Sequence, residues 1–554
     1  MQRILHLLFI LLIPASLFAQ PQPQDIQRLM DKARIPGLSL AYIKNGKIAQ
    51  LYTLGVRSAD TRIPVDSTTV FSAASLSKCV FAYGVMQLVD AGKLDLDKPL
   101  YNYFDYTDLK HDERYKQITA RQVLSHTSGL PNWRQGDQLN FQYNPGERFR
   151  YSGEGFVLLG KVVEKITGQA LEDFMQQTVF KPLGMTHSSF IWQKAFENDC
   201  AVPHSDIMQT NTSWQPTAPN TASSLQTTAA DYAKFEMALL NKRGLKAATF
   251  QQMFTPQPKS QMMEDNKTLY WGLGLGYELS DYGPAFWQWG DNGTFKAFLI
   301  GYPGKKEGLV YFANSYNGLA IANDLLHLFF NSNQPALEWL ATNYESLPFL
   351  ELLNRLNTQP FAEAMQPFLQ QGTNHQDTTL LPERRMNDLG YRLLGRKKNE
   401  TAAQIFTLNL NAYPQSANAY KGLGTAQLRS GEKDAAVATF RKYYALNPED
   451  TVANALASRL EGKEDAPRGD SMVMTTFRLE KYSAATAVIL GGSFNGWDDT
   501  LYPMHWNNGA WTIRLPLKPG KYEYKFSVDG VWIPDPANKK MEPNYQNSIL
   551  EVAK

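Results

Sequence analysis

The chain has 554 residues, more than a single hydrophobic core normally organises, so we expect two to four domains. Apolar residues make up 43% of the chain and aromatic residues 12%, a composition typical of folded globular units and unlike that of disordered chains. The 55 basic and 53 acidic residues leave a net charge of +2, so the composition gives no sign of a nucleic-acid partner.

Residues 1–19 have the pattern of a secretory signal peptide. Arg3 supplies a positive start, residues 4–13 are apolar, and small residues follow at Ala15 and Ala19. The apolar stretch is too short for a comfortable membrane span, and no later run of about 18 apolar residues follows. We therefore expect residues 1–19 to be removed and the mature chain to be exported, to the periplasm or the cell exterior, without a membrane span.

The next part of the chain predicts an α+β domain over residues 25–331. The stretch GLSLAYIKNGKIAQL, from Gly37, is typical of two strands joined by an Asn45-Gly46 turn. Helical and turn-rich stretches continue to about Ala230, and the strand-like segments YWGLGLGYEL, AFWQWGDNGTFKAFLIGYP and GLVYFANS follow. Strands at both ends of a largely helical middle indicate a sheet that joins distant segments of the chain.

A candidate nucleophile lies in the stretch FSAASLSKCVFAYG, which begins at Phe71. Lys78 follows Ser75 by three residues, so a helix starting here would place both side chains on one face. Burial at the head of an apolar helix and the positive end of the helix dipole both lower a lysine pKa. A neutral lysine amine can then take the serine proton. The same spacing recurs at Ser430 and Lys433, which we interpret as a solvated turn, so the pattern alone is a weak signal.

The two cysteines are Cys79 and Cys200. An exported protein could join them in a disulfide. Cys79 lies beside Lys78 on the presumed apolar helix, however, and this position favours a buried free thiol.

Residues 334–460 predict a helical region with an internal repeat over residues 386–453. Matching residues recur 34 positions apart: Leu389-Gly390 as Leu423-Gly424, Ala402 as Ala436, Phe406 as Phe440, and Pro414 as Pro448. The period and these positions match tetratricopeptide repeats, whereas the alternative is a helical hairpin duplicated by chance. Two repeats rarely stand alone, so we expect the helices of residues 334–369 to cap the stack. A peptide or protein is the partner expected of such repeats.

Residues 465–554 predict a small β-sandwich. The segments TAVILGGSFNGW, GAWTIRLPL, GKYEYKFSVDGVWI and NSILEV alternate in polarity and are separated by Gly, Asn, Asp and Pro. The expected fold is therefore multidomain: an α+β domain, then α-helical repeats, then a β-sandwich.

The α+β domain also resembles a known family. After the Ser75 stretch come VLSHTSGLPNW from Val123, YNPGERFRYSGEGF from Tyr143, SSLQTTAADYAKF from Ser223 and WQWGDNGTFKAF from Trp287. Their order and spacing resemble the serine beta-lactamase-related family, which includes class C beta-lactamases, DD-peptidases, D-aminopeptidases and esterases. The resemblance implies a beta-lactamase/transpeptidase-like fold, with Ser75 as the nucleophile that forms an acyl-enzyme and Lys78 as its base.

The same resemblance assigns roles to two further side chains. Tyr151 matches the tyrosine of the family's second motif, Tyr-x-Asn, and would act as an acid or base if a charged Lys78 lowered its pKa from about 10. The alternative is a buried structural tyrosine. His126 invites comparison with a Ser-His-Asp triad, but the matching histidine of the family is usually structural, and SHTSGL is typical of a packed turn.

Two positions depart from the family pattern. Gly153 stands in place of the second-motif asparagine, whose amide would bind the acyl-side carbonyl group of the substrate. Gln288, Trp289 and Gly290 stand in place of the third motif, Lys/His-x-Gly, and a one-residue shift would put Trp289 first; either way the cation is lost. In the family this cation helps to hold a substrate carboxylate. Its loss argues against beta-lactams and D-Ala-D-Ala peptides and favours uncharged esters or amides.

The oxyanion hole implied by the resemblance consists of the backbone amides of Ser75 and Asp291. Gly290 would let its strand approach the substrate closely. Trp289 would either supply an apolar wall or block the site, and the sequence leaves both open.

The C-terminal sandwich resembles the glycogen-binding, isoamylase-N-terminal-like carbohydrate modules of the family 48 type, through GSFNGW, LPLKPGKYEYKFSVDGVWIPDP and NSILEV. By this resemblance Trp497, Lys525, Trp532 and Asn547 would contact an α-glucan, since flat aromatic faces suit the apolar faces of sugars. The alternative is that the two tryptophans are framework residues of a module that does not bind glucan.

Three functions fit the sequence. The first is an exported serine hydrolase acting on a neutral ester or amide, either a small molecule or a cell-wall glycan-linked substrate. The second is a beta-lactamase or DD-peptidase, and the third is a catalytically inactive scaffold whose repeats hold a peptide and whose sandwich holds a sugar. The proposed acyl transfer needs no cofactor, and the sequence contains no His-x-x-x-His or paired-cysteine spacing for a metal.

Overall fold

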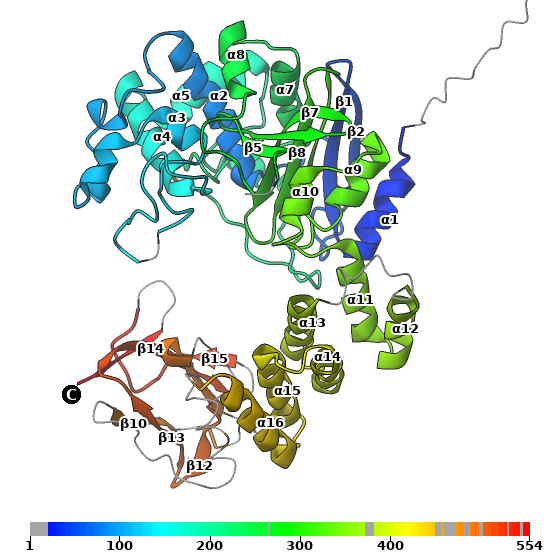
Figure 1. The fold of residues 1–554 in the computed structure, drawn as a ribbon, viewed down its shortest axis with the longest axis vertical. Coiled ribbons are helices and arrows are strands. Elements are labelled where there is room, and N and C mark those ends of the chain that lie inside the picture. The colour runs from blue at the N-terminus through cyan, green and yellow to red at the C-terminus, as the bar shows by residue number, and fades with distance from the viewer. Residues whose placement is uncertain are drawn as a thin grey trace, which may run out of the picture. The chain divides into compact units, whose positions relative to one another are not determined.

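The computed structural model describes residues 20–134, 136–263, 266–371, 382–448 and 457, together with residues 472–553 apart from 481, 484, 486–487, 496, 498–501, 529–530 and 543–546. The chain divides into two compact units, Met1–Leu350 and Glu351–Lys554 (Figure 1). The predicted signal peptide lies outside the described residues. Among the described helices, none is both long enough and apolar enough to cross a membrane.

A seven-stranded antiparallel sheet with the order β2-β1-β9-β8-β7-β6-β5 forms the centre of the first unit. The sheet joins the N-terminal hairpin to strands that lie far later in the chain, as the sequence predicts. Its strands are β1 (Gly37–Lys44), β2 (Lys47–Gly55), β5 (Leu269–Trp271), β6 (Gly276–Ser280), β7 (Gly283–Asp291), β8 (Lys296–Tyr302) and β9 (Glu307–Ala313). A separate pair is formed by β3 (Phe71–Ser72), which precedes the candidate nucleophile Ser75, and β4 (Gln226–Thr227).

The hairpin at the edge of the sheet has the predicted turn. Asn45 and Gly46 have φ values of 54° and 70°, the two positive angles that a two-residue turn matching the strand twist requires. The two faces of β1 serve different cores, because side chains alternate along a strand. Tyr42 meets Phe329 of α9 with ring centroids 4.9 Å apart, whereas Ala41 belongs to the core on the opposite face.

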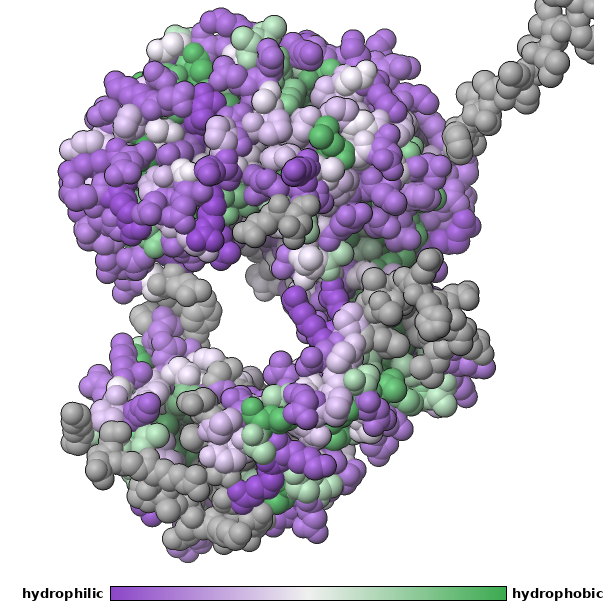
Figure 2. Space-filling model, viewed as in Figure 1, coloured by the Kyte–Doolittle hydropathy of each residue, from purple (hydrophilic) through white to green (hydrophobic). Residues whose placement is uncertain are grey.

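The helices of the first unit cover the sheet and build the region that holds the site, with the cyan helical part to one side of the sheet in Figure 1. They are α1 (Pro23–Ala33), α2 (Ser77–Asp90), α3 (Ala120–Leu124), α4 (Gly153–Thr167), α5 (Leu171–Met175), α6 (Lys181–Leu183), α7 (Ala229–Leu240), α8 (Ala247–Met253), α9 (Ala322–Phe330) and α10 (Pro335–Leu340). In the view of Figure 2 the surface is mostly hydrophilic with small scattered apolar patches, because the apolar side chains are largely in the cores.

The position of α10, which follows α9, differs from the prediction. The sequence predicted that the helices of residues 334–369 cap the repeats, but the first of them, α10, packs on the sheet of the first unit; for the later helices the expectation stays a prediction. The Ala336 amide donates to Glu278 Oε2 at 2.8 Å, and Tyr302 Oη donates to Gln334 Oε1 at 2.9 Å. The Trp339 indole lies over the sheet, 6.1 Å from that of Trp287. These hydrogen bonds and the ring contact tie α10 to the sheet.

The described part of the second unit contains six helices. The helices are α11 (Leu347–Thr358), which crosses from the first unit, then α12 (Phe361–Gln371), α13 (Glu383–Gly395), α14 (Asn399–Ala412), α15 (Ala417–Arg429) and α16 (Lys433–Leu446). The pairs α13/α14 and α15/α16 follow the predicted 34-residue period. A Cβ atom added at Gly390 or Gly422 would lie 2.5 or 2.2 Å from the Phe406 ring. Glycine at these positions therefore allows the helices to pack closely around that ring.

The C-terminal part is rich in β-strands, as predicted. One sheet has the order β10-β13-β12, and the other has β11-β14-β15 with β16 also paired to β14. The strands are β10 (Val473–Glu480), β11 (Val488–Gly492), β12 (His505–Asn507), β13 (Ala510–Leu517), β14 (Gly520–Val528), β15 (Val531–Ile533) and β16 (Ser548–Val552). Leu515 of the first sheet and Leu490 and Phe526 of the second belong to one apolar cluster, so the sheets enclose a common core.

Both cysteines are free thiols, and Cys79 is buried, as its position on the apolar helix predicted.

Candidate active site

Ser75 lies in a single tight turn, Ala74–Leu76, directly before α2. Ala74 has a φ of 48°, a left-handed conformation that residues with a side chain rarely adopt, so the chain turns sharply at the nucleophile. Helix α2 is apolar on nearly all sides and is therefore buried in the core. The side chain of Lys78, in the first turn of α2, is fully buried with it.

The Ser75–Lys78 pair has the geometry that proton transfer requires. Lys78 Nζ lies 3.1 Å from Ser75 Oγ and donates a hydrogen bond to the Ala222 carbonyl at 2.9 Å. Burial lowers the pKa of Lys78 from 10.5 to about 7. The Tyr151 ring, 4.8 Å from Nζ, favours the charged amine, but the cost of desolvation is larger. Near neutral pH, much of this lysine is a neutral amine that can accept the serine proton.

Tyr151 lies next to the same pair. Its hydroxyl interacts with Ser75 and accepts a hydrogen bond from Gln288 Nε2 at 3.3 Å. Burial raises the pKa of Tyr151 above its ordinary value, in the opposite direction from the sequence-based expectation. The hydrogen bonds with Ser75 and Gln288 favour a lower Tyr151 pKa but only partly offset the effect of burial. Tyr151 therefore stays protonated and is suited to relay a proton rather than to act as a phenolate base.

His126 is a packing residue. Its Nδ1 accepts a hydrogen bond from the Ser152 amide at 3.0 Å, and its ring lies 4.2 Å from that of Tyr151 and 4.8 Å from that of Trp271. Complete burial lowers the pKa of His126 well below its usual value. A neutral, buried imidazole fixed in this way positions Tyr151 and Ser152, in agreement with the structural interpretation of this histidine.

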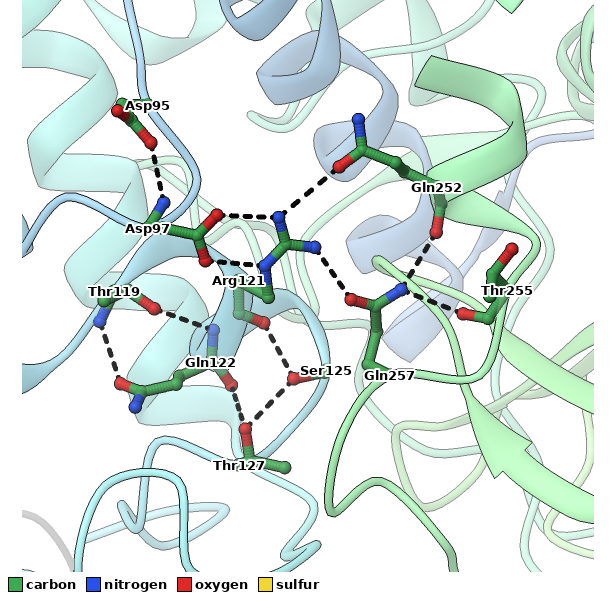
Figure 3. A network of polar contacts seen from close by, with 10 residues as sticks. All are labelled: Asp95, Asp97, Thr119, Arg121, Gln122, Ser125, Thr127, Gln252, Thr255 and Gln257. Carbon is green, nitrogen blue, oxygen red and sulfur yellow. Dashed lines mark hydrogen bonds and ion pairs between the residues drawn. The ribbon is translucent and has the colours of Figure 1, made fainter. Parts of the chain in front are cut away.

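A polar network anchors the turn that carries His126 (Figure 3). Arg121, on α3, donates to Asp97 at 2.7 and 2.8 Å and to Gln257 Oε1 at 2.9 Å. One residue further on, the Gln122 carbonyl accepts from the Thr127 amide at 2.8 Å. These bonds connect α3 to the loop that precedes β5 and fix the turn after α3, which carries His126.

Strand β7 approaches the nucleophile turn from the other side. Gln288 is fully buried, and its Nε2 lies 3.4 Å from the Ser75 carbonyl oxygen as well as near the Tyr151 hydroxyl. A Cβ atom added at Gly290 would lie 2.7 Å from the Ala73 carbonyl oxygen. Glycine is therefore needed for close approach to the nucleophile turn itself, whereas the sequence suggested a close approach to substrate.

The Trp289 indole is packed into an aromatic cluster. Its ring centroid lies 4.7 Å from that of Tyr151, 5.1 Å from that of Trp339 and 5.8 Å from that of Trp287. Its Nε1 donates to the Tyr344 hydroxyl at 3.0 Å. Only 8% of the side chain is exposed, so little of it remains to face a substrate.

The buried ammonium group of Lys296 lies near the end of β7 and is paired with a carboxylate. Lys296, opposite Asp291 in the β7–β8 ladder, is 3% exposed and forms an ion pair with Asp291 Oδ1. Burial lowers the pKa of Lys296, while the ion pair with Asp291 opposes this effect. Because this ammonium group already has a carboxylate partner, it is a poor substitute for the missing third-motif cation.

Trp133 is a site residue that the sequence analysis missed. A Cβ atom added at Gly153 would lie 2.9 Å from Trp133 Cη2 and 2.6 Å from the Asn132 carbonyl oxygen. The indole thus occupies the space next to the second-motif position, where any side chain would collide with it. Its ring lies 6.0 Å from Lys78 Nζ, and 44% of the side chain is exposed. The sequence carried no signal of this contact, because only the fold brings Trp133 and Gly153 together.

The predicted sugar-contact residues of the C-terminal part lie near one another. Trp497 and Trp532 have ring centroids 6.3 Å apart, and 37% of Trp532 is exposed. Trp532 pairs with Ser527 on β14, so Lys525, two residues before Ser527, points to the same face. Asn547 donates to Glu523 Oε2 at 2.8 Å. Glu523 was not predicted, although its place two residues before Lys525 puts it on this face.

Among the residues that the structure describes, no group of three or more His, Cys, Asp and Glu side chains is arranged to hold a metal ion.

Two family models match the chain. The Beta-lactamase model matches residues 23–332, and the model for the glycogen recognition site of AMP-activated protein kinase matches residues 473–554. The second match identifies the C-terminal part as a glycogen-binding module, as its sequence predicted.

Similar proteins cover only part of the chain. Protein flp of Staphylococcus aureus (strain N315) is 27% identical over 183 residues, 30% of this chain and 37% of that protein. Penicillin-binding protein 4 of Amycolatopsis lactamdurans is 29% identical over 192 residues, 32% of this chain and 50% of that protein. The chain thus matches half or less of the length of these curated relatives. The octameric penicillin-binding protein homologue from Pyrococcus abyssi shares the fold, with a TM-score of 0.50 and 22% identity over 60% of this chain and 80% of that one.

Proposed function

Because the chain belongs to the Beta-lactamase family, we propose that it is an exported serine hydrolase that forms an acyl-enzyme at Ser75 and acts on neutral esters or amides. The observation that carries this proposal is the 3.1 Å separation of Ser75 Oγ from Lys78 Nζ, with burial lowering the pKa of that lysine to about 7. A nucleophile beside a base that is neutral at working pH is what acyl transfer needs.

The proposed reaction has two halves. Neutral Lys78 accepts the Ser75 proton while Oγ attacks the carbonyl carbon, and the amides of Ser75 and Asp291 bind the resulting oxyanion. Collapse breaks the bond to the leaving group, which takes a proton from the Tyr151 hydroxyl; Tyr151 regains one from the Lys78 ammonium. Water then attacks the acyl-enzyme with Lys78 again as base, which releases the acid and restores Ser75.

The charges around the site support a neutral substrate. Gln288 stands at the position of the missing third-motif cation, and the nearby Lys296 is already paired with Asp291. A substrate carboxylate would therefore lose water without gaining an ionic partner. The partly exposed Trp133 indole, which fills the space beside Gly153, favours an apolar acyl group.

The other parts of the chain extend the proposal. The glycogen-binding module would hold an α-glucan through Trp497, Lys525, Trp532 and Asn547, and would keep the hydrolase near glycan-linked substrates. Residues 386–453 would act as tetratricopeptide-like repeats that take a peptide or protein partner. Residues 1–19 would direct export, and residues 25–331, 334–460 and 465–554 would form the catalytic, helical and glucan-binding parts.

A second candidate function is that of a beta-lactamase or DD-peptidase, favoured by the similarity to a penicillin-binding protein over 192 residues. The third, a catalytically inactive scaffold, is favoured by the loss of side-chain groups at Gly153 and Gln288.

A small fluorophosphonate probe tests the proposal, with intact mass as the readout. We expect one adduct on the mature protein and none on Ser75→Ala. The matched control is Ser430→Ala, which removes the other Ser-x-x-Lys serine and should still label. A folded wild-type protein that does not label would overturn the proposal and favour the scaffold. Labelling that persists in Ser75→Ala would overturn the assignment of Ser75 as the nucleophile.

A further inference from the structure

The segment that follows the family-matched residues returns to the candidate active site. It is held to the sheet by the Ala336–Glu278 and Gln334–Tyr302 hydrogen bonds. Trp339 then packs 5.1 Å from Trp289, ring centroid to ring centroid. The family model ends at residue 332, so these contacts come from outside the part of the chain that it matches.

Tyr344 makes the most direct contacts of this segment. Its hydroxyl accepts a hydrogen bond from Trp289 Nε1 at 3.0 Å and donates one to Asp291 Oδ2 at 2.9 Å. Trp289 packs against the Tyr151 ring at 4.7 Å, and Asp291 supplies an amide of the proposed oxyanion hole. A single hydroxyl group is thus bonded to two neighbours of the reacting atoms.

The local environment suits a fixed hydrogen-bond bridge. Burial and the neighbouring Asp291 raise the pKa of Tyr344, so its hydroxyl keeps its proton at any ordinary working pH. Hydrogen bonds to charged acceptors are the stronger kind, and the bond to Asp291 belongs to that class. The Tyr344 ring also lies 5.5 Å from the Lys296 ammonium, which adds a cation–π contact.

We propose that Tyr344 is a positioning residue of the acyl-transfer site, an inference that rests on the proposed hydrolase function. Through Trp289 it orients the Tyr151 ring, and through Asp291 it fixes the end of β7 that carries the oxyanion amide. Residues 333–346 then contribute to catalysis by positioning the active site, and they are more than a linker to the helices that follow.

The test is Tyr344→Phe, which keeps the ring and removes both hydrogen bonds. We expect kcat for a neutral ester to fall about tenfold with KM within about twofold, because positioning is lost and binding is not. The rate of fluorophosphonate labelling should fall by a similar factor. The matched control is Tyr282→Phe, which removes a tyrosine–carboxylate bond to Glu307 at the opposite end of β7 and should leave kcat unchanged.

A double-mutant cycle with Trp289→Phe tests the route of the effect. If Tyr344 acts through the Trp289 bond, the double variant loses less than the product of the two single losses. Losses that multiply fully would overturn the route through Trp289, and a kcat for Tyr344→Phe equal to that of the wild type would overturn the whole inference. If Tyr344→Phe does not fold, the kcat of Trp289→Phe tests the inference, since this substitution removes the indole donor and keeps an aromatic ring. An unchanged kcat for Trp289→Phe would overturn the inference.

The outcomes separate this inference from the function on which it rests. A folded wild-type protein without labelling or esterase activity overturns the proposed function, and the positioning role falls with it. An active wild type with an equally active Tyr344→Phe variant overturns the positioning role alone.

Discussion

The two sides of the candidate active site differ in how they are built. On the helix side, Ser75 and Lys78 stand 3.1 Å apart in a buried setting that lowers the lysine pKa. On the strand and second-motif side, Gln288, Gly153 and Trp133 offer neutral and aromatic groups where the family pattern has a cation and an amide. Because different elements hold these groups, the proposed proton transfer and the proposed substrate recognition depend on separate parts of the fold.

Removal of the base should have the largest effect. We expect Lys78→Met to lower the acylation rate about a thousandfold, because a general base contributes about 10² to 10⁴ in rate. In the wild type the rate should rise with pH and level off above an apparent pKa of about 7, as Lys78 loses its proton. Stopped-flow acylation between pH 5 and 9 measures both. Lys433→Met is the control, and a flat wild-type profile would contradict Lys78 as the titrating base.

Removal of the aromatic wall should change selectivity more than chemistry. We expect Trp133→Ala to reduce the preference for a hexanoyl over an acetyl ester by about tenfold, since each buried methylene contributes about 0.8 kcal/mol. The ratio of the two kcat/KM values measures this preference. Trp214→Ala, which removes an indole that is 51% exposed, is the control. An unchanged ratio would mean that Trp133 does not touch the acyl group.

A smaller effect is expected from a substitution in the C-terminal glycogen-binding module. We expect Trp532→Ala to weaken binding of a soluble α-glucan about fivefold, through loss of an aromatic face. The control is Trp506→Ala on β12, since Trp506 is 40% exposed and Trp532 37%. Calorimetric titration should give equal affinities for the wild type and Trp506→Ala. Equal weakening by both substitutions would instead indicate a general effect on the module.

The smallest effect on activity is expected at Glu278, under α10. Burial raises the pKa of Glu278 from 4.5 to about 8, so as pH rises the unfolded chain releases this proton before the folded one does. The free energy of unfolding should therefore fall between about pH 5 and pH 8, by at most about 1.4 kcal/mol per pH unit from this group. Urea unfolding of Glu278→Gln at several pH values should show a shallower fall, with kcat little changed. A slope equal to that of the wild type would contradict this assignment.

Much of the fold followed from local sequence signals. The Asn45-Gly46 turn, the strands that close the sheet and the 34-residue helical period depend on backbone conformation and residue alternation, which neighbouring residues determine. Ser75, Lys78 and Tyr151 are candidates from the sequence, because the family phrases surround them, and their catalytic roles stay a prediction.

The remaining site features depend on contacts between distant segments. Tyr344 reaches Asp291 and Trp289 across more than fifty residues, so no local pattern could indicate it. Trp133 and Gly153 fit each other sterically, which only their positions in space reveal. The sequence allowed a lowered Tyr151 pKa beside a charged Lys78 or a buried tyrosine, and the burial that raises this pKa depends on the tertiary packing.

The most direct test of the central claim is a comparison of two acylating agents on one protein preparation. The rate constants for acylation of Ser75 by a neutral p-nitrophenyl ester and by a penicillin would be measured under identical conditions, with intact mass and Ser75→Ala to locate the adduct. The account predicts rapid acylation by the ester and slow or absent acylation by the penicillin, because Gln288 at the third-motif position is neutral and the nearby Lys296 is paired with Asp291. Acylation by the penicillin at a rate equal to or above that of the ester would contradict it.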